Sequence, residues 1–276
     1  MKSRENHRIK KYDDGRFTEI PDPVSVEAPL QISLRHGKFG QRSTVKLAMT
    51  MRTPGQDDLL ASGYLFTENL IQHRNDIVQM RHLSDYEILV ELSENVTVDL
   101  TSQARNTYVN SSCGICGKSE LTEINATIPY LLTPGLPQIT SAEVCQWPGL
   151  LDEAQLEFRE TGGTHAAALI RKHAVINVQE DVGRHNALDK LLGFALQNLS
   201  LPLSDTAVVV SSRASFELVQ KALMAGIPIL ASFGAASSMA IETALDNNMT
   251  LIGFLKQAQF NVYTHGQRVT IQHDKG

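Results

Sequence analysis

Short apolar segments alternate with helix-like segments through the second half of the chain, and this alternation restricts the fold more than any other feature of the sequence. The expected elements, in chain order, are a helix over 141–158 interrupted at Pro148-Gly149, strands at 165–171 and 174–178, a helix over 184–199, a strand at 206–210, a helix over 214–225, a strand at 228–231, a helix over 237–245 and a strand at 250–254. Apolar strands separated by helices of about 10–15 residues indicate βαβ units. We therefore predict a three-layer α/β/α sheet for this half.

The first half shows a different pattern, in which apolar and polar residues alternate with a period of two. This pattern predicts half-buried strands at 30–34, 44–50, 86–92 and 96–100, with a helix over 57–70 that Thr53-Pro54 and Asp57-Asp58 introduce. Residues 1–20 are charged and aperiodic. The expected organisation is a mobile tail at 1–20, a small strand-rich α+β domain at 21–105, a polar loop at 106–118 and an α/β domain at 119–276.

Composition excludes several classes of protein. The 276 residues carry a formal net charge of −5, so no overall basic field attracts nucleic acid. Three cysteines are too few for a disulfide framework, and no apolar run reaches the roughly 18 residues that suggest a membrane span. The first sixteen residues contain no apolar stretch typical of a secretory signal. We expect a soluble cytoplasmic protein that binds neither nucleic acid nor membranes.

The motif Cys113-Gly-Ile-Cys116 is the strongest local signal. A structural zinc site would need two further ligands, for which only Cys145 and scattered histidines remain. A thioredoxin-type redox pair usually opens a helix, whereas turn-forming residues flank this motif. The third interpretation is a nucleophilic cysteine on a glycine-flanked tether that accepts a reactive group and passes it on. An accidental surface pair is the fourth.

Three strand-to-helix junctions of the predicted sheet are rich in polar and small residues, at 180–186, 211–215 and 233–238. In doubly wound sheets, ligands bind beyond the carboxyl ends of strands, where helix N-termini point. Together with Arg184 and Arg213, these junctions predict a cradle for an anion such as phosphate. In the alternative interpretation Asp181 and the serines only cap helices, while the arginines pair with Glu180 or Asp205.

Two further residues lie at strand ends of the predicted sheet. His165 follows Gly162-Gly163 and is either a ligand contact or general acid, or a histidine satisfied within the core. Lys256 lies near the carboxyl end of the last strand and is either a second anion contact or a solvated lysine. The sequence contains no GxGxxG, Walker A or HExxH motif.

Several stretches taken together resemble the FdhD family. They are Ser112-Cys-Gly-Ile-Cys-Gly117, Thr161-Gly-Gly-Thr-His-Ala-Ala-Ala168, Glu180-Asp-Val-Gly-Arg-His-Asn-Ala-Leu-Asp-Lys190, Ser211-Ser-Arg-Ala-Ser-Phe-Glu-Leu-Val-Gln-Lys221, Gly253-Phe254 and Val262-Tyr-Thr-His265. The resemblance covers about residues 27–268, and the motif from Glu180 to Lys190 is its most specific part. Members of that family are sulfur carriers needed for formate dehydrogenase activity.

The resemblance implies a sulfurtransferase. Such a protein takes persulfide sulfur from a cysteine desulfurase and transfers it to the molybdenum cofactor, Mo-bis(molybdopterin guanine dinucleotide), before the cofactor enters apo-formate dehydrogenase. It also implies a homodimer, and no intrinsic metal is expected. The persulfide-bearing cysteine of the family corresponds to Cys113, and Cys116 corresponds to the second cysteine, with a supporting or relay role.

The family's cofactor-binding stretch corresponds to Phe254, Leu255, Lys256, Gln257, Ala258 and Gln259. Relatives tend to have Gly or Pro and a second basic residue after the lysine, so phosphate contact here would depend on Lys256 and backbone groups. The resemblance further implies that the second domain is similar in fold to cytidine deaminases. Deamination itself is disfavoured, because the two helix starts that carry zinc ligands in those enzymes contain no cysteine here.

Two other functions stay open from the sequence. One is a nucleotide-dependent enzyme whose CxxC motif binds structural zinc. The other is a chaperone that binds and inserts the molybdenum cofactor without any covalent sulfur transfer. A protein that both transfers sulfur and delivers the cofactor is also compatible with the sequence.

Overall fold

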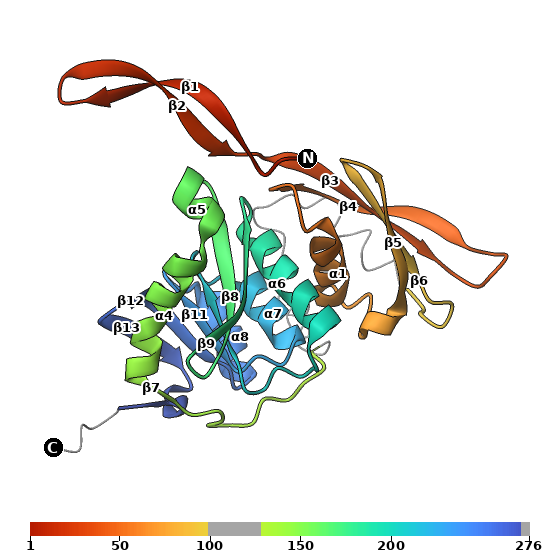
Figure 1. Cartoon of the computed structure of the whole chain (residues 1–276). Coiled ribbons are helices and arrows are strands. Elements are labelled where there is room, and N and C mark those ends of the chain that lie inside the picture. Colours follow the sequence, from red (N-terminus) through yellow and green to blue (C-terminus); the bar gives the residue numbers. More distant parts are fainter. Residues whose placement is uncertain (99–127, 272–276) are drawn as a thin grey trace.

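A computed structural model of the protein describes residues 1–98 and 128–271 (Figure 1). Its largest element is a six-stranded sheet in the order β13-β12-β11-β10-β8-β9. The strands are β8 (His165–Arg171), β9 (Ala174–Asp181), β10 (Ala207–Val210), β11 (Ile229–Ser232), β12 (Thr250–Lys256) and β13 (Gln259–Thr264). Strands β10, β11 and β12 are parallel, whereas β8 runs antiparallel to both β9 and β10, and β13 antiparallel to β12.

Helices cover both faces of this sheet, because its central strands are apolar on both sides. One face packs against α6 (Arg184–Asn198), α7 (Phe216–Met224) and α8 (Ser238–Asp246). The other face packs against α4 (Ser141–Ala154), which contributes Val144, Trp147 and Leu151. The predicted fold class, a three-layer α/β/α sheet with a smaller strand-rich N-terminal part, is confirmed.

The predicted interruption at Pro148-Gly149 is wrong. Helix α4 continues through Pro148 to Ala154, and the shorter α5 (Leu156–Thr161) follows. A proline removes one backbone hydrogen bond from a helix interior. Three fully buried side chains of α4, on either side of Pro148, pack against the sheet and keep the helix continuous across the missing bond.

The N-terminal part consists of a four-stranded sheet in the order β4-β3-β6-β5 and one long helix. Its elements are β3 (Ala28–His36), β4 (Ser43–Arg52), α1 (Asp57–Thr67), η1 (Arg74–Asp76), β5 (Ile77–Ser84) and β6 (Glu87–Leu92). The sequence did not predict β5, and residues 96–98 of the strand expected at 96–100 lie outside any strand. A short parallel pair, β7 (Ile139–Thr140) with β14 (Val269–Thr270), joins the two ends of the α/β part, next to η2 (Gly266–Arg268).

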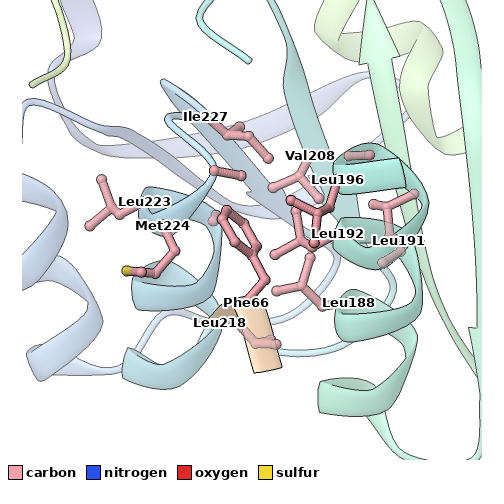
Figure 2. Packing of buried hydrophobic residues seen from close by; sticks show 14 of the residues in the cluster. Phe66, Leu188, Leu191, Leu192, Leu196, Val208, Leu218, Leu223, Met224 and Ile227 are labelled. Carbon is pink, nitrogen blue, oxygen red and sulfur yellow. The ribbon is translucent and has the colours of Figure 1, made fainter. Parts of the chain in front are cut away.

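Helix α1 connects the N-terminal sheet to the larger one. It crosses α6 so closely that a Cβ on Gly63 would lie 1.8 Å from the Asp189 carbonyl oxygen, and one on Gly193 would lie 2.0 Å from the Leu59 oxygen. Phe66 of α1 inserts between α6 and α7, where it meets side chains such as Leu192 and Leu218 (Figure 2). The two parts expected from the sequence therefore share one hydrophobic cluster.

For residues 1–20 we expected a mobile tail without strands, but the structure contains two strands there. Residues Arg4–Asp13 (β1) and Arg16–Ser25 (β2) form a regular antiparallel hairpin of ten residue pairs that projects from the molecule (Figure 1). Most of its side chains are exposed on both faces. The hairpin has no buried face to impose apolar alternation, so its strands gave no periodic signal. No helix in the described part of the chain is both long and apolar enough to cross a membrane.

Candidate functional site

The carboxyl ends of β9, β10, β11 and β12 meet at one edge of the large sheet, because these four strands run in the same direction. The three polar junctions singled out in the sequence follow β9, β10 and β11 at this edge, and Lys256 ends β12. His165 begins β8 at the same edge, opposite Asp181 in the register. The structure thus places Arg184, Arg213, His165 and Lys256 along one side of the molecule, which we call the carboxyl edge.

A buried ion pair fixes the junction between β9 and α6. The Lys190 ammonium lies 2.7 Å from the Asp181 carboxylate, and both side chains are almost completely buried. Asp181 also accepts hydrogen bonds from the backbone N–H groups of Gly183 and Thr53, and from the Asn186 side chain. Buried charges are tolerated when they are paired and hydrogen-bonded in this way. Asp181 is therefore a buried counter-ion, and the residue that caps α6 is Gly183.

Thr53, in the loop between β4 and α1, binds this junction with all three of its polar groups. Its N–H donates to Asp181, its hydroxyl accepts from the Val182 N–H at 3.0 Å, and its carbonyl accepts from Lys190 at 3.0 Å. Asn186 adds a second link, because its amide donates to the Met51 carbonyl. The N-terminal part therefore holds the loop that carries Arg184.

The alternative pairing of the two arginines is not found. Within residues 1–98 and 128–271, neither Arg184 nor Arg213 makes an ion pair or a side-chain hydrogen bond. Asp205 pairs instead with Arg171 at 2.9 Å. Glu180 accepts hydrogen bonds from the N–H groups of Glu157 and Phe158, at the start of α5, and from the Thr164 hydroxyl. Among the described residues, therefore, neither guanidinium group has a hydrogen-bond acceptor.

Two histidines lie beside Arg184. His165 is half-buried, its Nδ1 is 3.5 Å from the Ser211 hydroxyl, and burial together with the charges of Arg184 and His185 lowers its pKa. His185 pairs with Glu217 of α7 at 3.0 Å. The hydrogen bond from His185 lowers the pKa of Glu217 to about 2, against the opposing effect of burial. The lowered pKa favours the neutral form of the His165 imidazole, next to the positive charge of Arg184.

The loops after β10 and β11 are joined to each other and to the last residues of β12. The N–H of Phe254 donates to the Gly234 carbonyl at 3.0 Å, and the Gly234 N–H donates to Ser212 at 3.1 Å. Gly234 packs directly against the Arg213 side chain. A Cβ at position 234 would lie only 2.8 Å from Arg213 Cγ. Arg213 and Phe254 therefore both contact Gly234. Phe254 adopts a left-handed backbone conformation (φ 51°) and its side chain is 44% exposed.

The stretch from Phe254 to Gln259 is a β-hairpin, which the sequence did not predict. Strand β12 continues to Lys256, Gln257 and Ala258 form the turn, and Gln259 begins β13 opposite Lys256. The Leu255 side chain is only 2% exposed and packs in the core, so it is not available to a ligand at this surface. Lys256, Gln257, Ala258 and Gln259 are exposed. Cys113 and Cys116 lie outside the described residues.

The lysines that end the two longest motifs have structural roles that the sequence did not reveal. Lys190 neutralises Asp181, and Lys221 of α7 pairs with Asp189 of α6 at 2.9 Å and with Glu68 after α1 at 3.6 Å. Burial lowers the pKa of Lys221, but the carboxylates of Asp189 and Glu68 outweigh it and raise the pKa above its ordinary value. In the described ranges, no three His, Cys, Asp or Glu side chains come close enough to hold a metal ion.

The fold and the carboxyl edge define an α/β protein whose polar loops converge on one side of a mixed sheet. The model of the FdhD/NarQ family matches residues 25–270, and the chain belongs to this family. It is 39% identical over 279 residues to the sulfur carrier protein FdhD of Streptomyces coelicolor, which covers 97% of this chain and 96% of the relative. It is 37% identical over 279 residues to that of Mycobacterium tuberculosis (96% and 98%) and 39% identical over 265 residues to that of Sulfolobus acidocaldarius (96% and 98%).

A solved structure supports the fold across almost the whole chain. It is the crystal structure of a protein proposed as a formate dehydrogenase accessory protein from Desulfotalea psychrophila. The TM-score is 0.73 at 20% identity, and the match covers 97% of this chain and 99% of the other. At this identity the similarity shows the fold alone.

Proposed function

We propose that this protein carries sulfur for the maturation of formate dehydrogenase. The observation that supports this most directly is the similarity, at 37–39% identity over nearly the full length, to relatives named sulfur carrier protein FdhD. The sequence also contains the Cys113-Gly-Ile-Cys116 motif that a thiol-based carrier needs. The proposed partners are a cysteine desulfurase as donor and apo-formate dehydrogenase as the final acceptor.

The first step we propose is loading of Cys113. The Cys113 thiolate attacks the outer sulfur of the desulfurase persulfide, a sulfur–sulfur bond forms on Cys113, and the desulfurase cysteine leaves as a thiolate. No electrons are gained or lost overall, because one persulfide replaces another. This step requires only that the thiolate of Cys113 reach the donor.

The second step we propose delivers the sulfur to the molybdenum cofactor, which is the substrate. Cys116 attacks the inner sulfur of the Cys113 persulfide, the two cysteines close a disulfide, and the outer sulfur leaves as hydrosulfide. Hydrosulfide then replaces an oxygen ligand of the cofactor, which departs as water. The two thiols supply the two electrons that reduce the sulfur. A dithiol reductant then reduces the Cys113–Cys116 disulfide back to two thiols.

The carboxyl edge supports binding of the nucleotide phosphates of Mo-bis(molybdopterin guanine dinucleotide). Arg184 and Arg213 carry guanidinium groups without a carboxylate partner in the described chain, and guanidinium binds phosphate in bidentate fashion. Lys256 adds a point charge at the end of β12, and the exposed Phe254 ring offers an apolar surface for a base. The Gln257-Ala258 turn adds no second cation.

The test is activation of formate dehydrogenase in cells that depend on this protein. We expect Cys113→Ala to abolish activation without changing the fold, and Cys116→Ala to lower it strongly. Cys145→Ala is the matched control, and this variant should activate formate dehydrogenase as well as the wild type does. Full activation by Cys113→Ala together with retained cofactor binding would instead assign a chaperone without a covalent step.

A further inference from the structure

The four-stranded N-terminal sheet has two unlike faces, and helix α1 covers one of them (Figure 1). Residues such as Ile32 and Val90 belong to that face, because they are part of the hydrophobic cluster that α1 shares. Side chains alternate along each strand, so Arg35 and Glu91, partners in the β3–β6 register, belong to the opposite face, together with Arg81 of β5. We call this opposite side the outer face.

Three arginines converge on one carboxylate of the outer face. The Glu91 carboxylate lies 3.4 Å from the Arg42 guanidinium and 3.8 Å from that of Arg35. It also accepts a hydrogen bond from Arg81. One carboxylate neutralises a single positive charge, so two of these three charges have no counter-ion in the cluster. The side chains of Arg35 and Arg81 are 42% and 44% exposed, which leaves their remaining N–H donors open to solvent.

Lys46 of β4 adds a fourth cation to the outer face. It is exposed, and it makes no ion pair within the part of the chain that the structure describes. Glu87 is a second acid on this face, so the four cations exceed the two acids by two charges. We call Arg35, Arg42, Lys46 and Arg81 the basic patch. On a chain with a formal net charge of −5, such a patch attracts an acidic partner surface locally.

The basic patch lies at the end of β6, and it has an aromatic side chain close to it in the sequence. The Arg42 guanidinium donates a hydrogen bond of 2.6 Å to the carbonyl of Leu92, the last residue of β6. Phe39, in the turn between β3 and β4, is 87% exposed and precedes Arg42 by three residues. Arginine and aromatic side chains are enriched where proteins contact one another. The patch therefore has the composition of a protein–protein contact.

We propose that the basic patch is the docking surface for an acidic region of the sulfur donor, an inference that rests on the proposed function. The enzyme that receives the cofactor must contact the carboxyl edge, where Arg184 and Arg213 lie, because the cofactor leaves from there. The donor has to meet only Cys113, and the chain leads from the end of β6, at the patch, to that residue 21 positions further on. The two partners thereby use separate surfaces.

Charge reversal tests this docking with the purified cysteine desulfurase, whose dissociation constant is measured by biolayer interferometry at physiological salt. We expect Arg35→Glu with Lys46→Glu to raise that constant about tenfold or more, because attractive contacts become repulsive. Arg35→Gln with Lys46→Gln adds no repulsion toward Glu91 and should raise it about threefold or more. At about 0.5 M salt the wild-type constant should approach that of the variants, because salt screens exposed charges. Phe39→Ser should weaken binding without any change of charge.

Arg159→Glu with Lys172→Glu is the matched control, because it changes the net charge equally at exposed positions of α5 and the β8–β9 turn. This variant should bind the donor as the wild type does. Glutathione persulfide needs no docking surface, so it should load Cys113 equally in the wild-type and charge-reversed proteins, which verifies that the variants are folded and that their thiol is intact.

The proposal is overturned if both patch variants bind the donor normally, or if the control variant loses binding to the same extent. Loss of binding to apo-formate dehydrogenase, with donor binding unaltered, would also overturn it, because the patch would then serve the acceptor. A wild-type protein that binds the donor through the patch but gains no sulfur would support the docking surface and contradict the proposed carrier function. The two proposals therefore fail in different measurements.

Discussion

The backbone N–H of Thr53 donates a hydrogen bond of 3.1 Å to the buried carboxylate of Asp181. The two residues are 128 positions apart in the chain, in the N-terminal part and in the large sheet. Through this bond and the Thr53–Val182 and Thr53–Lys190 bonds, the loop before α1 fixes the start of α6. The position of Arg184 at the carboxyl edge thus depends on a residue that belongs to none of the recognisable motifs.

The Thr53 hydroxyl should contribute measurably to stability. Thr53→Val keeps the shape of the side chain but removes the acceptor of the Val182 N–H, and an amide left without a partner costs about 1–3 kcal/mol. Thr53→Ser retains the oxygen and should lose much less. Urea unfolding of the two variants measures this difference. Equal stability of Thr53→Val and wild type would contradict the assigned role.

Removing the ammonium of Lys190 should destabilise the protein far more. Lys190→Met leaves the Asp181 carboxylate buried without its counter-ion, and breaking a buried pair in this way costs about 3–5 kcal/mol. Lys172→Met, at an exposed position in the β8–β9 turn, is the matched control and should unfold like wild type. The free energy of unfolding in urea separates the two variants; a loss below about 1 kcal/mol for Lys190→Met would mean that the pair is not essential.

The crossing of α1 and α6 requires glycine. A methyl group at Gly63 would lie 1.8 Å from the Asp189 carbonyl oxygen, so Gly63→Ala must push the helices apart and disturb the core around Phe66. We expect a loss of several kcal/mol, about 3 or more, as for severe overpacking. Gly149→Ala in α4 has open space around it and should be neutral or stabilising. Thermal unfolding compares them, and tolerance of Gly63→Ala would show that the close approach is not needed.

The titration of His165 should report on Arg184. Burial and the charges of Arg184 and His185 lower the pKa of His165 from its ordinary value of 6.5. The unfolded chain then binds this proton more readily than the folded one, so the stability contribution is complete above about pH 6.5 and decreases as the pH falls toward the folded-state pKa. Arg184→Gln should move the pKa of His165 upward, as measured by NMR of the imidazole.

Arg159→Gln, on α5, is the control for that titration and should leave the pKa of His165 unaltered. An Arg184→Gln variant in which His165 titrates as in wild type would show that the two side chains do not interact in solution.

The sequence predicted the large sheet well because its short apolar strands alternate regularly with helical segments. Segments at 206–210 and 228–231 correspond closely to β10 and β11. The β1–β2 hairpin escaped prediction, since a hairpin exposed on both faces has no hydrophobic period. Strands β5 and β13 were also missed. Each lies at the edge of a sheet, and six of the eight residues of β5 and three of the six residues of β13 are exposed.

The polar residues of the candidate site could be predicted from the sequence, but the contacts that hold them in position could not. Arg184, Arg213 and Lys256 could be placed at strand ends from the local pattern, and the sheet brings them to one edge. The sequence offered no signal that Asp181 is a counter-ion to Lys190, because that depends on Thr53 and on burial. Nor did it show that Phe254–Gln259 turns back as a hairpin; Gln257 and Ala258 are not typical turn residues.

The most direct test of the proposed function is the intact mass of the purified protein after incubation with a cysteine desulfurase and free cysteine. A sulfur carrier should gain one or more sulfur atoms in a form that a reductant removes, and the Cys113→Ala variant should gain none. No gain in the wild-type protein, or the same gain in Cys113→Ala, would contradict the assignment of Cys113 as the sulfur-carrying residue.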